Sequence, residues 1–241
     1  MPKQFDDDKI IQQNDQQIAW YCQAVTLITQ HMYLKCFGTM ILIGVFFAVY
    51  FYMLSYPVYP ITVMPITFID ELISFQPTTL PIYLSLWLYV SLPPALLATK
   101  RELFHYALAM IFTSIIGFAI FYFWPTTLPL ATIDWPQSPE ISFLKGIDAA
   151  GNACPSFHVA TAFFSGCWLH YLFRRIDAPQ SILVINWLWC IAIVYSTLAI
   201  RQHVVVDVVA GLALGGLIAH LSLQYHKKQA QPYAKPRSSS I

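Results

Sequence analysis

The stretch PSFHVATAFFSGCWLHYLF, residues 155–173, places a serine and a histidine at the head of a long apolar run. A second stretch, HVVVDVVAGLALGGLIAHLSL, residues 203–223, does the same with a histidine and an aspartate. Ionisable side chains at membrane depth are unfavourable unless they face a cavity or a partner, so they mark functional sites by default. The two stretches therefore predict one polar site shared by two helices.

The composition places both stretches in a membrane. Hydrophobic residues make up 57% of the 241 residues and charged residues only 10%, whereas a soluble domain carries about 25% charged residues. The mean hydropathy of +0.57 agrees with this assignment. An ordinary soluble domain is excluded.

Six apolar windows are long enough to cross a bilayer, which takes roughly 20 residues of helix. They are 36–54, 80–99, 103–124, 155–173, 182–200 and 203–223. The second window contains Pro93 and Pro94, where we expect a kink. The predicted fold class is an all-α, polytopic six-transmembrane-helix bundle. Segment 1–35 precedes it with an interfacial helix, the membrane domain covers 36–225, and a polar tail occupies 226–241.

The positive charges predict an orientation. With six crossings, one side receives eleven of the thirteen Lys and Arg residues, namely Lys3, Lys9, Lys35, Lys100, Arg101, Arg174, Arg175, Lys227, Lys228, Lys235 and Arg237. Only Lys145 and Arg201 fall on the other side. By the positive-inside rule both termini are cytoplasmic, and both polar clusters face the periplasm, lumen or exterior.

The residues at the two helix heads offer groups suited to phosphoryl chemistry. His203 and Asp207 are four residues apart and hence on one helix face, where the aspartate can accept the Nδ1–H and leave Nε2 free as a nucleophile. His158 can act as a general acid because imidazole titrates near neutral pH. Pro155 is a favourable first helical residue, and the first-turn N–H groups beside Ser156 favour a phosphate-like anion. Because both spans run inward from the same side, their two dipoles converge on one site.

Other interpretations of these residues stay open. A hydrogen bond to a backbone carbonyl explains either histidine equally well when it is taken alone. His158, His203 and Asp207 also amount to three ligands, enough for catalytic zinc. We expect no metal, because no fourth His, Cys or carboxylate accompanies them.

Two further features concern packing. The five cysteines have no paired spacing, and Cys154 is either a reactive thiol or, as we favour, a small apolar filler. Gly211 and Gly215 form a small-xxx-small pattern, which permits close backbone approach. We expect this pattern to serve packing within the chain rather than dimerisation.

Together, Pro-Ser-x-His at the head of one span and His-x-x-x-Asp at the head of the span after next resemble the type 2 phosphatidic acid phosphatase superfamily. The sequences Phe123-Trp124-Pro125-Thr126 and Gly151-Asn152-Ala153-Cys154-Pro155-Ser156-Phe157-His158 are most similar to its inositol phosphorylceramide synthase-like branch. The resemblance covers residues 103–223.

This resemblance implies a membrane lipid phosphatase that hydrolyses a lipid phosphate or diphosphate through a phosphohistidine, without metal or other cofactor. It implies that His203 attacks phosphorus, Asp207 orients it and His158 protonates the departing lipid oxygen. Further substrate-binding candidates are Ser156, Phe157, Asn152, Arg201 and Lys145. The expected partners are the lipid phosphate substrate and the bilayer, with no nucleic acid.

The chain departs from the family pattern at two places. A lysine followed seven residues later by Arg-Pro does not precede Pro155, and Thr197 stands where an arginine usually lies six residues before the histidine. Arg201 and Lys145 are candidates to supply the missing charge. These losses suit a lipid phosphotransferase with an alcohol acceptor, which is the second hypothesis. A non-catalytic lipid-binding or lipid-moving protein is the third, although such a scaffold would not need both histidines and the aspartate.

Overall fold

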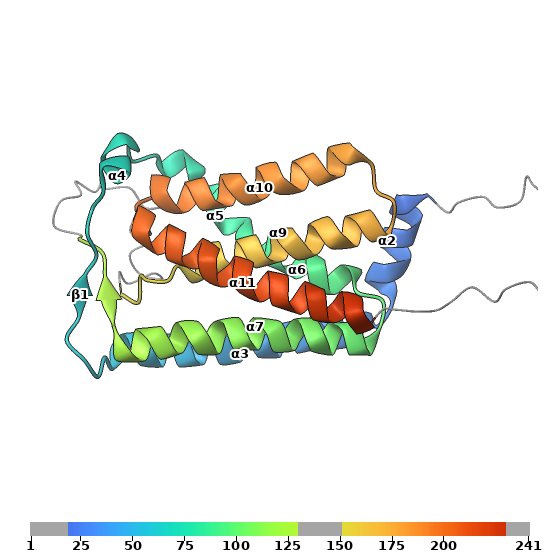
Figure 1. The fold of residues 1–241 in the computed structure, drawn as a ribbon, viewed down its shortest axis with the longest axis horizontal. Helices are drawn as coiled ribbons and strands as arrows, with labels where there is room; N and C mark the ends of the chain where they lie inside the picture. Colours follow the sequence, from blue (N-terminus) through green and yellow to red (C-terminus); the bar gives the residue numbers. More distant parts are fainter. Residues whose placement is uncertain (1–18, 130–150, 230–241) are drawn as a thin grey trace, which may run out of the picture.

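The structure is a computed structural model that describes residues 19–129 and 151–229. These residues form a mostly helical bundle (Figure 1). The helices are α2 (Trp20–Thr29), α3 (Met32–Ser55), α4 (Phe68–Leu72), α5 (Leu80–Leu84), α6 (Leu86–Leu96), α7 (Lys100–Phe123), α9 (Phe157–Arg175), α10 (Gln180–Ala199) and α11 (Val205–Gln229), and the 3₁₀ turn η1 (Pro77–Thr79) precedes α5. The strands β1 (Thr62–Val63) and β2 (Thr126–Thr127) pair in parallel. The all-α prediction omitted this small sheet, because two-residue strands in loops leave no periodic pattern in the sequence.

Five described helical runs are long and apolar enough to cross a membrane. They are Met32–Ser55, Pro77–Leu96, Lys100–Phe123, Gln180–Ala199 and Val205–Gln229. Their length and composition indicate a membrane protein, and each overlaps one predicted window. The fourth window corresponds to α9, a helix of 19 residues that is less apolar than the other five. It carries His158, His170, Arg174 and Arg175.

The second predicted window is interrupted at one residue. Pro93 and Pro94 lie inside α6, near its end, while the interruption falls at Ser85 between α5 and α6. There the Ser85 hydroxyl donates to the carbonyl of Ile82 at 2.6 Å and accepts from the indole N–H of Trp189 at 2.8 Å. Serines that bond the preceding turn are often found where helices bend, and the kink expected at Pro93 and Pro94 stays a prediction.

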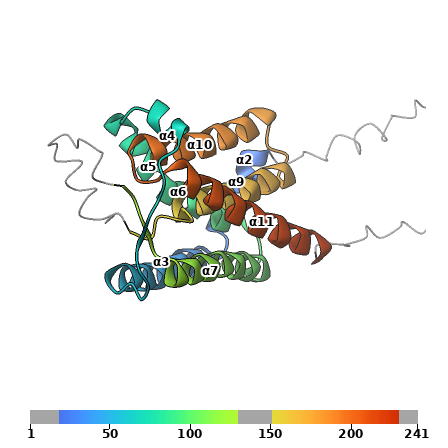
Figure 2. The ribbon, with the colours of Figure 1, turned by 60° about the vertical axis from the view of Figure 1, so that its left-hand side comes forward.

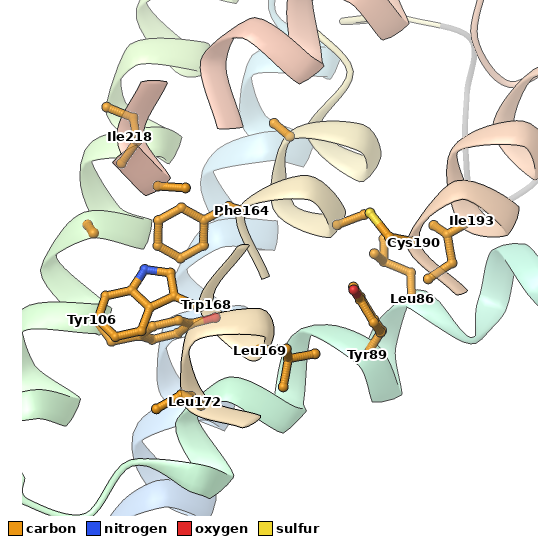
Figure 3. Packing of buried hydrophobic residues seen from close by; sticks show 14 of the residues in the cluster. Leu86, Tyr89, Tyr106, Phe164, Trp168, Leu169, Leu172, Cys190, Ile193 and Ile218 are labelled. Carbon is orange, nitrogen blue, oxygen red and sulfur yellow. The ribbon is translucent and has the colours of Figure 1, made fainter. Parts of the chain in front are cut away.

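Helix α9 lies at the centre of the bundle, in contact with α6, α7, α10 and α11 (Figures 1 and 2). Phe164 and Trp168 are fully buried, and their rings pack against Tyr106 of α7 (Figure 3). By contrast, none of the apolar window of α3 is buried. The least apolar of the long helices is therefore the one enclosed by the others, while α3 presents apolar side chains outward.

A buried polar network fastens α9 to its neighbours. The Tyr89 hydroxyl of α6 donates to the side-chain oxygen of Asn186 at 2.8 Å, and the Asn186 amide donates to the carbonyl of Gly166 at 3.1 Å. Buried polar groups are favourable only when they are paired, so these bonds select one arrangement of α6, α9 and α10.

The two glycines of α11 pack against the backbone of α9. A Cβ on Gly211 would lie 2.6 Å from the carbonyl oxygen of Ser156, and one on Gly215 would overlap the carbonyl oxygen of Ala160. These residues therefore serve contact within the chain, as the sequence predicted. Because α11 follows His203 and α9 follows Ser156, this contact also places the two polar clusters side by side.

The bundle has two chemically different ends. Helix α2 and the C-terminal end of α11 lie at one end, which we call the terminal end, whereas α4, β1 and β2 lie at the other, the strand end (Figure 1). The predicted interfacial helix corresponds to α2, which has no buried residue. Most described cations lie at or near the terminal end, namely Lys35, Lys100, Arg101, Arg174, Arg175, Lys227 and Lys228, and Arg201 lies at the strand end.

The α9–α11 contact yields a prediction. Gly215→Ala forces a methyl group against the carbonyl of Ala160, and we expect it to lower stability by about 1–3 kcal/mol, as overpacking does. Gly44→Ala in α3 is the matched control, because a Cβ there meets no atom within 4 Å. Thermal unfolding in detergent should show a lower midpoint for the first variant only. Equal midpoints would contradict the close contact.

Candidate active site

The two polar clusters meet at the strand end of the bundle. Ser156 is the N-cap of α9, where its hydroxyl oxygen accepts the N–H of Val159 at 3.2 Å. Its own backbone N–H donates to the carbonyl of Asp207 at 3.1 Å. One backbone hydrogen bond therefore joins the heads of α9 and α11. Helix α9 begins at Phe157 rather than at Pro155 as predicted, because Ser156 is the capping residue.

His158 lies in the first turn of α9 and contacts a tyrosine from another helix. The Tyr83 hydroxyl of α5 is 2.6 Å from Nε2 of His158, and the two rings stack with centroids 4.6 Å apart. A phenol can donate to neutral imidazole or accept from imidazolium, so this contact suits both protonation states. Tyr83 thereby holds the orientation of the His158 ring.

His203 lies close to His158, with ring centroids 5.7 Å apart. The sequence placed His203 and Asp207 in the same helix, and this is wrong for His203. It precedes α11, which begins at Val205. His203 is instead positioned by its backbone N–H, which donates to the carbonyl of Thr197 at 3.2 Å. Thr197 is the residue that stands in place of the usual family arginine.

The side chains of His203 and Asp207 lie close together, but the expected hydrogen bond between them is not formed. Nδ1 of His203 is 3.5 Å from Oδ2 of Asp207, beyond the 2.6–3.2 Å of a catalytic hydrogen bond as a rough guide. Asp207 is fully buried, and its Oδ2 also accepts the N–H of Val204 at 3.2 Å. The Asp207 carboxylate therefore caps α11 and lies on the Nδ1 side of His203, whose buried Nδ1 has no hydrogen-bond partner in the described structure.

A second carboxylate, from the loop that contains α4, supports the head of α11. Oδ1 of Asp70 accepts the N–H of Val205 at 2.8 Å, while its Oδ2 accepts from the N–H and hydroxyl of Thr67 at 2.8 and 2.7 Å. Asp70 is only 2% exposed. Two carboxylates thus occupy the positive end of the α11 dipole. Of the two predicted helix termini, α9 is consequently the better place for a phosphate.

Arg201 bonds the same α4 loop. It has a left-handed backbone, with a φ of 58°, and its guanidinium donates to the carbonyls of Asp70 and Ile73 at 2.8 and 2.7 Å. The side chain fastens this loop to the segment before His203. Substrate binding by Arg201 stays a prediction, and Lys145 lies outside the described residues.

The other predicted substrate ligands occupy different surroundings. Phe157 packs its ring against Phe46, Phe118 and Phe121 at centroid distances of 5.1, 5.2 and 5.1 Å, and so belongs to an aromatic cluster between α3 and α7. Asn152 is buried with a left-handed φ of 55°, and its amide nitrogen has no hydrogen-bond partner in the described structure. Substrate contact by Ser156, Phe157 and Asn152 stays a prediction.

Cys154 lies beside the site in a buried position. Burial, and secondarily the Asp207 carboxylate, raise the pKa of its thiol to about 11. The thiol is therefore protonated at neutral pH, which favours the filler interpretation over a reactive thiolate. Within residues 19–129 and 151–229, no group of three His, Cys, Asp or Glu side chains is arranged to hold a metal ion.

Comparison with known proteins identifies the family of the chain. The model of the PAP2 superfamily matches residues 101–231, more than half of the chain. The chain belongs to the PAP2 superfamily. Members of this superfamily are generally phosphatases or phosphotransferases. No curated protein and no solved structure matches the chain significantly.

The site of this PAP2 superfamily protein includes two residues that the sequence analysis missed. Tyr83 lies in an apolar, aromatic run where nothing distinguishes it from its neighbours. Asp70 was detectable, because Thr67 and Asp70 have the spacing of a capping box, which the structure confirms. Both lie before residue 101, outside the matched region.

The Asp70 contact yields a prediction. Asp70→Ala leaves the N–H of Val205 without its acceptor, so we expect a stability loss of about 1–3 kcal/mol and faster amide exchange around 203–207. Glu71→Ala is the control, because that neighbouring carboxylate is exposed. Hydrogen–deuterium exchange followed by mass spectrometry should show the change for Asp70→Ala alone. Unchanged exchange in both variants would show that the α4 loop does not hold the head of α11.

Proposed function

We propose that this protein is a membrane lipid phosphatase, which hydrolyses a lipid phosphate or diphosphate through a phosphohistidine on His203. The observation that carries the proposal is the approach of His158 and His203, whose ring centroids are 5.7 Å apart although they come from different helices. Family membership supports phosphoryl chemistry, and the Asp207 carboxylate on the Nδ1 side of His203 supports that ring as the nucleophile.

The proposed reaction has two displacements. Nε2 of His203 attacks the terminal phosphorus while its bond to the leaving oxygen breaks, and protonated His158 gives its proton to that oxygen. The product released is the lipid alcohol from a phosphate, or the lipid monophosphate from a diphosphate. Water then attacks the phosphohistidine, and His158 takes a proton from it. The phosphorus–nitrogen bond breaks, phosphate leaves, and both histidines return to their starting states.

The surrounding residues have distinct proposed tasks. Asp207 stabilises the N–H tautomer of His203, and Tyr83 keeps the His158 ring oriented toward the leaving oxygen. The first-turn N–H groups of α9 beside Ser156 receive phosphoryl oxygens as charge develops. Phe157, Asn152, Arg201 and Lys145 remain proposed substrate contacts. The mechanism uses no metal or other cofactor.

The proposed membrane arrangement has six crossings, with α9 as the fourth. Both termini are cytoplasmic, because the described cations gather at or near the terminal end, and the site opens on the periplasmic, lumenal or extracellular side. Enclosure of α9 by α6, α7, α10 and α11 supports its crossing despite its lower apolarity.

A lipid phosphotransferase is the second candidate. The absence of the usual lysine and arginine signatures favours it, as does the local similarity to the inositol phosphorylceramide synthase-like branch. An alcohol would then replace water in the second displacement. Purified protein given a panel of lipid phosphates, with and without alcohol acceptors, distinguishes the two: free phosphate supports hydrolysis, and a new phosphorylated lipid supports transfer.

The nucleophile yields the central prediction. With ³²P-labelled lipid phosphate and EDTA present, wild-type protein should form an acid-labile phosphoenzyme, and His203→Ala should form none. Asp207→Asn should lower turnover by about 10⁴-fold, the loss typical of mis-setting a catalytic histidine tautomer. His220→Ala is the control, since that exposed histidine lies farther along α11. Full turnover by His203→Ala would show that His203 is not the nucleophile. Another chemical mechanism, or a non-catalytic role for this site, would then have to explain the arrangement.

Tyr83 yields a prediction about the leaving group. Tyr83→Phe keeps the stacked ring but removes the hydroxyl, so we expect turnover of an alkyl lipid phosphate to fall about 10-fold, a part of the 10²–10⁴ that general acid catalysis supplies. Turnover of p-nitrophenyl phosphate, whose leaving group needs no proton, should hardly change. Tyr195→Phe removes a hydroxyl that contacts Gln76 instead and serves as the control. Equal losses on both substrates would indicate a purely structural role.

A further inference from the structure

The connection between α3 and η1, residues 56–76, is apolar although it is too irregular to cross a membrane. Its only charged residues are Asp70 and Glu71, and it contains no Lys, Arg or His. Three prolines, the two-residue strand β1 and the five-residue helix α4 divide it into short pieces. Because a connection that lies in water is normally polar, this composition calls for an apolar environment around at least part of the segment.

Helix α4 has a polar side and an apolar side that point in opposite directions. The buried Asp70 carboxylate accepts the N–H of Val205 at 2.8 Å and so faces the head of α11. Phe68, Ile69 and Leu72 lie on the other side of the helix and are 72%, 51% and 66% exposed. A helix on the surface of a soluble protein turns its apolar side toward the core. The outer side of α4 is therefore a contact surface for an apolar partner.

Backbone groups at both ends of α4 are paired with side chains of the protein. At the N-terminal end, the Asp70 carboxylate accepts the N–H of Thr67 at 2.8 Å. At the C-terminal end, the Arg201 guanidinium donates to the carbonyls of Asp70 and Ile73 at 2.8 and 2.7 Å. Water can satisfy the free groups of a helix end, whereas hydrocarbon cannot. The pairing therefore suits a helix that lies where water is scarce.

Aromatic side chains mark the membrane boundary at the strand end. The Tyr59 and Tyr122 rings pack edge to face, with centroids 6.0 Å apart, next to the ends of α3 and α7. The indole N–H of Trp124 donates to the hydroxyl of Thr62 at 3.0 Å. Tyrosine and tryptophan are enriched at the level of the lipid headgroups. Helix α4 lies at this same end of the bundle (Figures 1 and 2), so it lies near that level.

The outer side of α4 continues the lipid-facing surface of α10. Gln76, four residues after Leu72, donates its N–H to the carbonyl of Ala199 and its amide to the hydroxyl of Tyr195, both at 2.8 Å. Tyr195 is exposed, as is Leu188, which lies seven residues earlier on the same side of α10. Exposed side chains of a spanning helix face lipid, so the surface that adjoins α4 identifies the partner as the bilayer.

We propose that α4 is a membrane-docking helix, whose Phe68, Ile69 and Leu72 insert between lipids at the boundary of headgroups and chains. Its inner side at the same time holds the head of α11 through Asp70. One short helix thus joins the lipid surface to the segment that carries His203, and it fixes the histidine site at headgroup level. The docking goes beyond the proposed function and does not depend on it, because it concerns where the chain meets the bilayer.

Depth measurements in a bilayer test this docking without any lipid phosphate. A nitroxide label is attached to Leu72→Cys and, as the matched control, to Glu71→Cys, whose native carboxylate is exposed on the same helix. The full-length protein has serine at its cysteines that are not buried, and it is reconstituted in phosphatidylcholine nanodiscs. Electron paramagnetic resonance then compares collisions with oxygen, which concentrates in lipid, and with a water-soluble nickel chelate. Ile69→Cys provides a second site on the apolar side.

We expect labels at residues 69 and 72 to collide with the nickel chelate several-fold less often than the label at residue 71, and with oxygen more often. Frequent nickel collisions at all three positions would place α4 in water and overturn the docking. Rare collisions with both reagents at 69 and 72 would show that protein covers this side, which overturns it as well. Loss of the phosphohistidine on His203 would leave these results unchanged, so the docking and the proposed function fail separately. Thermal unfolding confirms that the labelled variants are folded.

Discussion

The contact between α9 and α11 is the constraint on which the rest of the site depends. Gly211 and Gly215 allow the α11 backbone to lie against the carbonyls of Ser156 and Ala160, where any side chain would collide. The hydrogen bond from the Ser156 N–H to the Asp207 carbonyl then aligns the two helix heads. Because backbone contact leaves little freedom to slide, His158 and His203 are held near one another.

Support for this junction comes from a loop far away in sequence. Asp70 accepts the N–H of Val205, and Arg201 donates to two carbonyls at the end of α4. In both contacts the donor lies in residues 201–205 and the acceptor in the α4 loop, so several hydrogen bonds fasten the head of α11 to that loop. An arginine that the sequence offers as a phosphate ligand is thereby engaged with the protein itself.

The two sides of segment 151–156 carry different kinds of side chain. On one side, two histidines, a carboxylate and Tyr83 form a compact proton-handling group. On the other, a cavity of about 250 Å³ is lined, among the described residues, by apolar side chains, two threonines, Gly151 and Asn152. Enclosure of α9 by the other helices keeps the polar residues of the first group away from lipid.

The sequence by itself determined the membrane class, the approximate helices and the identity of the catalytic candidates, because hydropathy over about 20 residues and short polar motifs are local properties. It also indicated that Gly211 and Gly215 pack within the chain. It did not anticipate the interruption at Ser85, set His203 inside α11, and passed over Tyr83 and Asp70. Those features depend on partners from distant segments: Trp189 beside Ser85, Thr197 beneath His203, His158 beside Tyr83 and Val205 beside Asp70. Only the tertiary structure brings such pairs together, and no local pattern records which aromatic or acidic side chain will face the site.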